Sequence, residues 1–130
     1  MKILILGAGR VGSSLASTLS REEYEVSIVD LNKDKLLKLQ EEFDLATEIG
    51  HGSHPLTLEK AGADKDTILL AVTNSDECNI ISCQIAKSKF NVKKTICRLS
   101  DSSYLESLEA FGSDNIDIAI GPENEVTEHL

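Results

Sequence analysis

The sequence predicts an α/β fold, a doubly wound parallel sheet of six strands in the order 3-2-1-4-5-6 with helices on both faces. Short apolar runs alternate six times with segments of helical periodicity, which requires parallel strands joined by right-handed crossovers. Hydrophobic residues make up 41% of the chain but aromatic residues only 4%, so Leu, Ile, Val and Ala must form the core. Such a core is typical of a sheet covered by helices. A glycine-rich turn between the first apolar run and the first helical segment is the third indication.

The first half of the chain supplies three strands. Ile3–Leu6 is an apolar run that predicts a buried strand, and the helical segment that follows it contains Val11, Leu15 and Leu19. The other expected elements are a strand at Val26–Val29, a helix at Lys33–Phe43 that Asn32 caps and that turns Leu36, Leu37 and Leu39 inward, a strand at Ala46–Ile49, and a helix at Leu56–Ala61 that Gly62 ends.

The second half supplies three more strands. Thr67–Val72 is apolar after its threonine, which predicts a central strand. The other expected elements are a helix that carries Ile80, Ile81, Ile85 and Ala86 and reaches about Lys89, a strand at Lys94–Arg98, a helix at Tyr104–Phe111 closed by Gly112, a strand at Ile116–Ile120, and a last helix at Glu123–Leu130 after Pro122.

Composition narrows the class of protein. A chain of 130 residues suits one domain, and a net charge of −9 argues against nucleic acid as a partner. Cys78, Cys83 and Cys97 form no metal-type spacing, and an odd count without a signal peptide indicates reduced thiols in a cytoplasmic protein. No apolar run approaches the roughly 18 residues that a membrane span needs.

The glycine-rich turn has the spacing of a dinucleotide-binding motif. Gly7, Gly9 and Gly12 fill the three positions of GxGxxG between a strand and a helix. Gly7 permits the tight turn, Gly9 lets a pyrophosphate approach the backbone, and Gly12 lets the helix pack closely on the strand. Asp30 ends the second strand, where its carboxylate can accept hydrogen bonds from both hydroxyls of an adenosine ribose. The alternative is a purely structural glycine turn with Asp30 as a helix cap.

In this fold a ligand lies across the carboxyl ends of the strands, so residues just past those ends are the candidates. Arg10 is expected beside the phosphates and His51 near adenine, whereas Arg98 is expected either on the nicotinamide or second-phosphate side or in a salt bridge. Asn79 is a further residue that could reach the ligand. The full set of predicted contacts is Gly7, Ala8, Gly9, Arg10, Val11, Asp30, His51, Thr73, Asn74 and Arg98. His51 and His54 lack a third ligand of suitable spacing, so no metal site is predicted.

Asp30 also bears on the choice of nucleotide. Its charge would oppose a 2′-phosphate, and Leu31 and Asn32 offer no cation, although Lys33 and Lys35 are near. We therefore predict NAD(H) or an adenine nucleotide over NADP(H).

These motifs resemble those of the RCK/KTN domain, the TrkA N-terminal domain of potassium-uptake and potassium-channel regulators. The likeness spans essentially the whole chain, and its most specific part is the AVTxxDExN run from Ala71 to Asn79. The third loop of the family usually reads GDxTDP. Here His51 and His54 replace the two aspartates, a form that is similar to the TrkA branch. The other matching segments are residues 7–12, 29–30, 58–62 and 97–101, with Tyr104.

The resemblance implies a peripheral cytoplasmic subunit at the inner face of the plasma membrane, partnered by a Trk-type potassium transporter. It implies binding of NAD(H), with ATP/ADP also possible, and a homodimer or higher oligomer whose conformation the ligand changes. Residues 1–130 would be the first nucleotide-binding lobe, a fragment of a longer TrkA-like protein, and no catalytic residue is expected. Nucleotide contacts carried over from the family are Gly7 to Val11, Asp30, His51, Thr73, Asn74 and Arg98.

Two other functions are alternatives to nucleotide sensing. A dehydrogenase fragment is disfavoured because the six strands and their helices leave no room for a substrate domain and no obvious proton donor. A structural relic that dimerises without a ligand is the third possibility. A dimer face could use Val126 and Leu130 on the last helix and the Ile80–Ile85 helix, although ordinary core packing explains these residues equally well.

Overall fold

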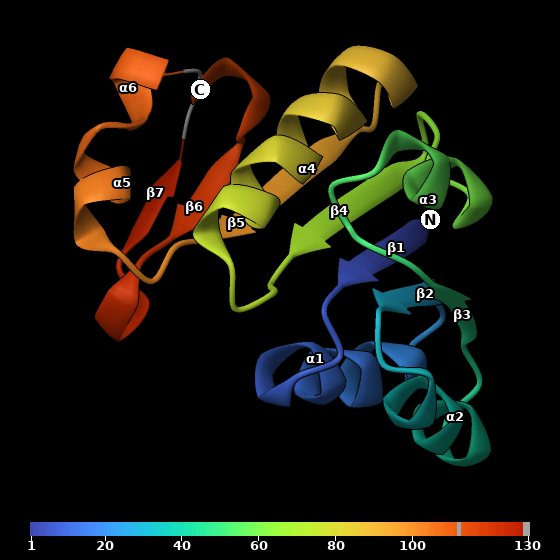
Figure 1. Cartoon of the computed structure of the whole chain (residues 1–130). Helices are drawn as coiled ribbons and strands as arrows, with labels where there is room; N and C mark the ends of the chain where they lie inside the picture. Colours follow the sequence, from blue (N-terminus) through green and yellow to red (C-terminus); the bar gives the residue numbers. More distant parts are fainter. Residues whose placement is uncertain (112, 129–130) are drawn as a thin grey trace.

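A computed structural model of the chain, which describes residues 1–111 and 113–128, shows one twisted sheet with helices on both faces (Figure 1). The strand order is β3-β2-β1-β4-β5-β6-β7; the first six strands are parallel and β7 is antiparallel to β6. The strands are β1 Lys2–Leu6, β2 Glu25–Asp30, β3 Ala46–Ile49, β4 Thr67–Ala71, β5 Lys94–Arg98, β6 Ile118–Ile120 and β7 Val126–Glu128. The helices are α1 Arg10–Ser20, α2 Lys33–Glu42, α3 Pro55–Lys60, α4 Asp76–Phe90, α5 Ser102–Glu106 and α6 Leu108–Phe111, with short 3-10 turns η1 Ser113–Asn115 and η2 Pro122–Asn124.

Alternate residues of the central strands build two separate cores. Ile3 and Ile5 of β1 face the core that α1 and α2 cover, whereas Leu4 and Leu6 face the core under α3 and α4. Figure 1 shows the same division, with α1 and α2 together on one side of the sheet. Both faces of β1 are therefore buried, which explains why its sequence is apolar without alternation. The doubly wound architecture predicted from the sequence is confirmed.

The prediction for the end of the chain was wrong. Residues 126–128 form the antiparallel strand β7, so the sheet has seven strands rather than six, where a helix over Glu123–Leu130 was expected. Glu123 adopts the left-handed conformation (φ 61°), and the Gly121 N–H donates to the carbonyl oxygen of Glu125 at 2.7 Å. This tight turn reverses the chain after Pro122, so the helix that proline would favour does not continue.

Smaller differences follow from local packing. The expected helix at Tyr104–Phe111 is two short helices, because the chain leaves the helical conformation at Ser107. Leu37 points outward, with 44% of its surface exposed, whereas Leu36 and Leu39 are buried as predicted. Of the suggested dimer face, Ile80 is buried and Val126 lies on β7 rather than on a helix. Gly112 and Leu130 lie outside the described residues.

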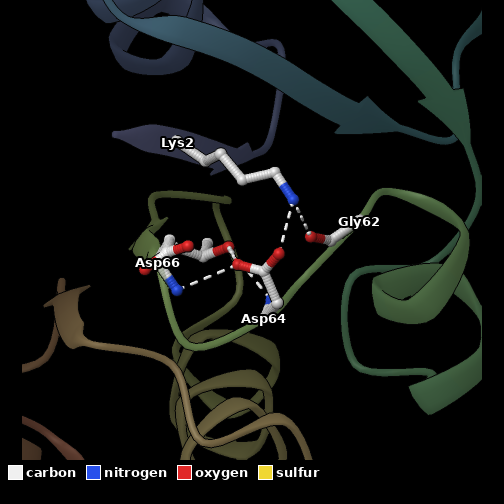
Figure 2. A network of polar contacts seen from close by, with 5 residues as sticks. Lys2, Gly62, Asp64 and Asp66 are labelled. Atoms are coloured by element: carbon white, nitrogen blue, oxygen red, sulfur yellow. Dashed lines mark hydrogen bonds and ion pairs between the residues drawn. The ribbon is translucent and has the colours of Figure 1, made fainter.

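A polar cluster joins the amino end of β1 to the loop before β4 (Figure 2). The Lys2 ammonium donates to Asp64 Oδ2 at 2.7 Å and to the carbonyl oxygen of Gly62 at 2.9 Å. Asp64 Oδ1 accepts from the backbone N–H of Asp66 at 2.9 Å. The cluster lies where the amino ends of β1 and β4 meet, at the end of the strands opposite to their carboxyl ends. It fixes the loop from which the central strand β4 starts.

None of the helices in the described part of the chain is both long and apolar enough to cross a membrane.

Candidate nucleotide-binding site

A cleft of about 720 Å³ opens at the carboxyl ends of β1, β2, β4 and β5. This is the place where the strand order reverses direction, because α1 and α4 leave β1 and β4 on opposite faces of the sheet. Nine of the ten predicted contact residues line the cleft: Gly7, Gly9, Arg10, Val11, Asp30, His51, Thr73, Asn74 and Arg98. The tenth, Ala8, is buried beneath the turn.

Gly7 and Gly12 have the mechanical roles in the turn that their spacing predicts. Gly7 has φ +106°, and a Cβ atom there would lie 2.9 Å from Thr73 Cα. A Cβ atom on Gly12 would lie 1.7 Å from the carbonyl oxygen of Gly7, so α1 can approach β1 closely only because Gly12 has no side chain. Around Gly9, no atom beyond the adjacent residues lies within 4 Å of the Cβ position. The backbone at Gly9 is therefore open on the side where a phosphate group would approach.

Asp30 holds the glycine turn through its carboxylate. Oδ2 accepts a hydrogen bond from the Ala8 N–H at 2.7 Å, and Oδ1 accepts one from the Asn32 N–H at 2.7 Å. Asn32, rather than Asp30, caps α2, since its side chain accepts from the Lys35 N–H at 3.1 Å. Each carboxylate oxygen can accept a second hydrogen bond, so Asp30 retains acceptor capacity that faces the cleft.

Asn79 is not a ligand contact, and that prediction was wrong. The residue is completely buried and links two strand ends. Its Nδ2 donates to the carbonyl oxygens of Thr73 at 3.1 Å and Arg98 at 2.8 Å, while Oδ1 accepts from the Thr73 N–H at 3.0 Å and hydroxyl at 2.7 Å. Since its amide is fully engaged, Asn79 positions the loops of β4 and β5 that carry the lining residues.

Arg98 lies at the far end of the cleft from Asp30. Its guanidinium Nη1 donates to the carbonyl oxygen of Thr73 at 3.4 Å. Among the side chains that the structure describes, the salt bridge considered for Arg98 is not found; the ion pairs found there are Lys2–Asp64 and Lys87–Asp117. Its cationic group is therefore directed to a backbone carbonyl and to the cleft.

His51 and His54 differ in their relation to the cleft. His51 lines it, and its Nδ1 accepts from the Ser53 N–H at 3.2 Å, which places the proton of the neutral ring on Nε2. His54 stacks on His51 with 4.8 Å between ring centroids and does not line the cleft. Among the described residues no cluster of three His, Cys, Asp or Glu side chains could hold a metal ion.

Several residues outside the predicted set of contacts also shape this site. Leu31, Lys35 and Cys78 also line the cleft. Burial raises the pKa of the Cys78 thiol. Asp76 is buried at the start of α4, where it accepts from the backbone N–H groups of Ser100 at 2.8 Å and Asp101 at 2.9 Å. A helix N-terminus alone explains an acidic residue at position 76, so only the tertiary contact reveals its role.

The charge of the cleft is opposite to that of the whole chain. Arg10, Lys35 and Arg98 line it, and Asp30 is the one carboxylate among the described residues that line it. The chain as a whole carries a net charge of −9. A concave site with several cations in an acidic protein favours a small anionic ligand.

The sheet order, the glycine turn and the acidic residue after β2 together define a Rossmann-like domain. The TrkA-N domain model matches residues 3–120, and the chain belongs to this family.

Relatives and solved structures agree with this assignment. The chain is 43% identical to the Trk system potassium uptake protein TrkA of Halomonas elongata over 132 residues and 44% identical to that of Vibrio alginolyticus over 133 residues. All of the chain is matched, and it spans 29% of the length of each of these two relatives.

Two solved structures share the fold at low sequence identity. The Kef C-terminal domain of Shewanella denitrificans in AMP-bound form has a TM-score of 0.73 at 20% identity, over 89% of this chain and 70% of that one. A GsuK channel bound to NAD has a TM-score of 0.67 at 21% identity, over 84% of this chain and 20% of that one.

Proposed function

We propose that this chain is the nucleotide-sensing lobe of a regulatory subunit of a potassium-uptake transporter, and that the cleft binds NAD(H) or ATP/ADP. The observation that carries the proposal is the open glycine turn with the Asp30 carboxylate beside it. The Halomonas and Vibrio TrkA relatives supply the transport context, and the AMP-bound Kef domain and the NAD-bound GsuK channel supply examples of adenine nucleotides bound to proteins of this fold.

The proposed ligand has a definite orientation in the cleft. Its phosphates lie over Gly9 at the N-terminus of α1, where free N–H groups and the helix dipole favour negative charge, and Arg10 supplies a cation. The ribose hydroxyls donate to the remaining acceptor sites of Asp30. His51 offers an Nε2–H donor toward the adenine, and Thr73, Asn74 and Arg98 line the part of the cleft left for a second nucleotide half or further phosphates.

Regulation follows if the nucleotide prefers one arrangement of an oligomer. A ligand shifts such an equilibrium only by the difference in its affinity for the two states. The strand ends that would contact the ligand are tied together by Asn79 and by the bonds from Asp76 to Ser100 and Asp101. If a ligand displaces Arg98, the loop before α5 would therefore move with it. Through this movement the occupied cleft could alter contacts with a second subunit or a membrane partner.

Thermal unfolding with NADH, NAD, NADPH, ATP and ADP in turn tests the proposal. A ligand at a hundred times its dissociation constant adds about 2.7 kcal/mol, which raises the midpoint of a domain of this size by roughly 10 °C. The shift should disappear in Asp30→Ala. It should persist in Asp44→Ala, which removes an exposed carboxylate outside the cleft. If no nucleotide shifts the midpoint of the wild-type chain, the proposed function is wrong.

Regulation rather than catalysis is part of the same proposal. A dehydrogenase would oxidise NADH in the presence of a suitable ketoacid, so absorbance at the NADH maximum would fall steadily. We expect the absorbance to stay constant after binding. A steady, enzyme-dependent loss would favour the oxidoreductase alternative.

A further inference from the structure

Lys35 lies at the adenosine end of the cleft, in the first turn of α2. It lines the cleft together with Asp30 and Leu31. The Asn32 cap bonds to the Lys35 N–H, and the Asp30 carboxylate bonds to the Asn32 N–H, so the start of α2 is fixed relative to the end of β2. The backbone that carries Lys35 is therefore held in place by the residue proposed to bind ribose.

The Lys35 ammonium group has no carboxylate partner in the described part of the chain. Both ion pairs found there, Lys2–Asp64 and Lys87–Asp117, lie elsewhere. Lys33 is equally exposed but does not line the cleft. Of the two lysines near Asp30, Lys35 is therefore the one that lies where it can contribute a cation to the ligand.

The Asp30 carboxylate repels a nearby phosphate less strongly than an isolated carboxylate would. Both of its oxygens already accept charge-assisted hydrogen bonds from backbone N–H groups. An ammonium group attracts a phosphate, whereas the Asp30 carboxylate repels it. At similar distances the two interaction energies are of similar size. From the sequence alone, the charge of Asp30 predicts that a phosphorylated ribose is disfavoured. The structure places Lys35 with Asp30 among the residues that line the cleft.

We infer that Lys35 is the specificity residue that lets the cleft accept adenine nucleotides with a phosphate on the adenosine ribose, such as NADPH, alongside the unphosphorylated ones. The inference rests on the proposed nucleotide function. In this arrangement NADH binds more tightly than NADPH because of the Asp30 charge. Lys35 reduces the difference in affinity between the two ligands.

Calorimetric titration of NADH and NADPH into the wild-type chain, Lys35→Gln, Lys35→Arg and Lys33→Gln tests this assignment. We expect wild-type affinity for NADPH to lie within about tenfold of that for NADH. Lys35→Gln should weaken NADPH about five- to tenfold, as for loss of a partly exposed charged hydrogen bond, and should change NADH less than about twofold. Lys35→Arg should retain NADPH binding, and Lys33→Gln should match the wild type.

The outcomes separate this inference from the function on which it rests. If NADH binds but Lys35→Gln leaves the ratio of the two affinities unchanged, or weakens both ligands equally, Lys35 does not set specificity. The same holds if NADPH does not bind at all while NADH does. If neither nucleotide binds the wild-type chain, the proposed function and this inference both fail.

Discussion

The Asp30 carboxylate lies 2.7 Å from the backbone nitrogen of Ala8, so the end of β2 fixes the glycine turn that follows β1. The predicted ligand contact is thus also a structural tie. Substitution at this position should affect stability as well as affinity, and the two effects can be measured separately.

Asp30→Ala should lower the free energy of unfolding by about 2 kcal/mol, because hydrogen bonds to a carboxylate contribute about 1.5–3 kcal/mol and the buried Ala8 N–H loses its partner. Urea unfolding of the ligand-free chain measures this loss. Asp30→Asn keeps one acceptor oxygen and should cost less. A fully stable Asp30→Ala chain would mean that the bond to Ala8 contributes nothing.

Gly9→Ala should abolish nucleotide binding with little loss of stability. The Cβ position has no neighbour within 4 Å, and φ −75° is accessible to alanine, so the fold tolerates the methyl group. That methyl group would occupy the place proposed for the phosphate. Calorimetry with NADH and urea unfolding give the two readouts.

Gly12→Ala is the matched comparison. Its Cβ would lie 1.7 Å from the Gly7 carbonyl oxygen, so α1 must move away from β1. Overpacking of this kind costs about 1–3 kcal/mol or more. Equal stability of the two alanine variants would show that α1 does not depend on close contact with the turn.

Asn79→Ala should lower the free energy of unfolding by about 3 kcal/mol, since the carbonyl oxygen of Arg98 and the N–H of Thr73 lose their partner in a buried environment. Asn74→Ala, at an exposed position in the loop between β4 and α4, should change stability by less than about 0.5 kcal/mol. Chemical unfolding compares them. Similar values for both variants would contradict the positioning role of Asn79.

The Lys2–Asp64 pair should give stability a defined pH dependence. The hydrogen bond from Lys2, with that from Asp66, lowers the pKa of Asp64 below its ordinary value of 3.8. The bond to Asp64 raises the pKa of Lys2 above 10.5. The contribution of the Lys2–Asp64 pair to the free energy of unfolding is thus complete between these two pKa values. It is lost as pH falls through the folded pKa of Asp64 and also as pH rises through the folded pKa of Lys2.

Asp64→Asn therefore should be less stable than wild type at pH 7 by under about 1 kcal/mol, because both side chains are partly exposed. Unfolding curves at several pH values should show the difference vanish in strong acid. A difference that is constant from neutral to strongly acidic pH would assign the effect to something other than ionisation of Asp64.

Two kinds of feature were predicted best from the sequence. They are the elements whose hydrophobic pattern repeats along the chain and the positions where the backbone geometry requires glycine. The six parallel strands, their order and the roles of Gly7 and Gly12 were found, since buried apolar runs and glycine spacing are local signals. Prediction failed for β7 because the left-handed turn at Glu123 has no strong sequence signal. It failed for Asn79 because the sequence does not distinguish an asparagine that faces the ligand from the first turn of a helix from one that is buried against neighbouring strand ends.

By itself the sequence determined that the chain is a doubly wound sheet with a glycine turn at its centre and an acidic residue after the second strand. The tertiary structure decided which polar side chains face the cleft and which hold it together. Asn79 and Asp76 follow the lining residues Thr73 and Asn74 closely in sequence, yet both bond to distant backbone groups. Asn79 donates to the carbonyl oxygen of Arg98 at the end of β5, and Asp76 accepts from the N–H of Ser100 in the loop that follows. Lys35 joins the cleft because the Asn32 cap fixes the first turn of α2 beside Asp30. These relations depend on contacts between segments that only the folded chain brings together, and hydrophobic periodicity does not encode them.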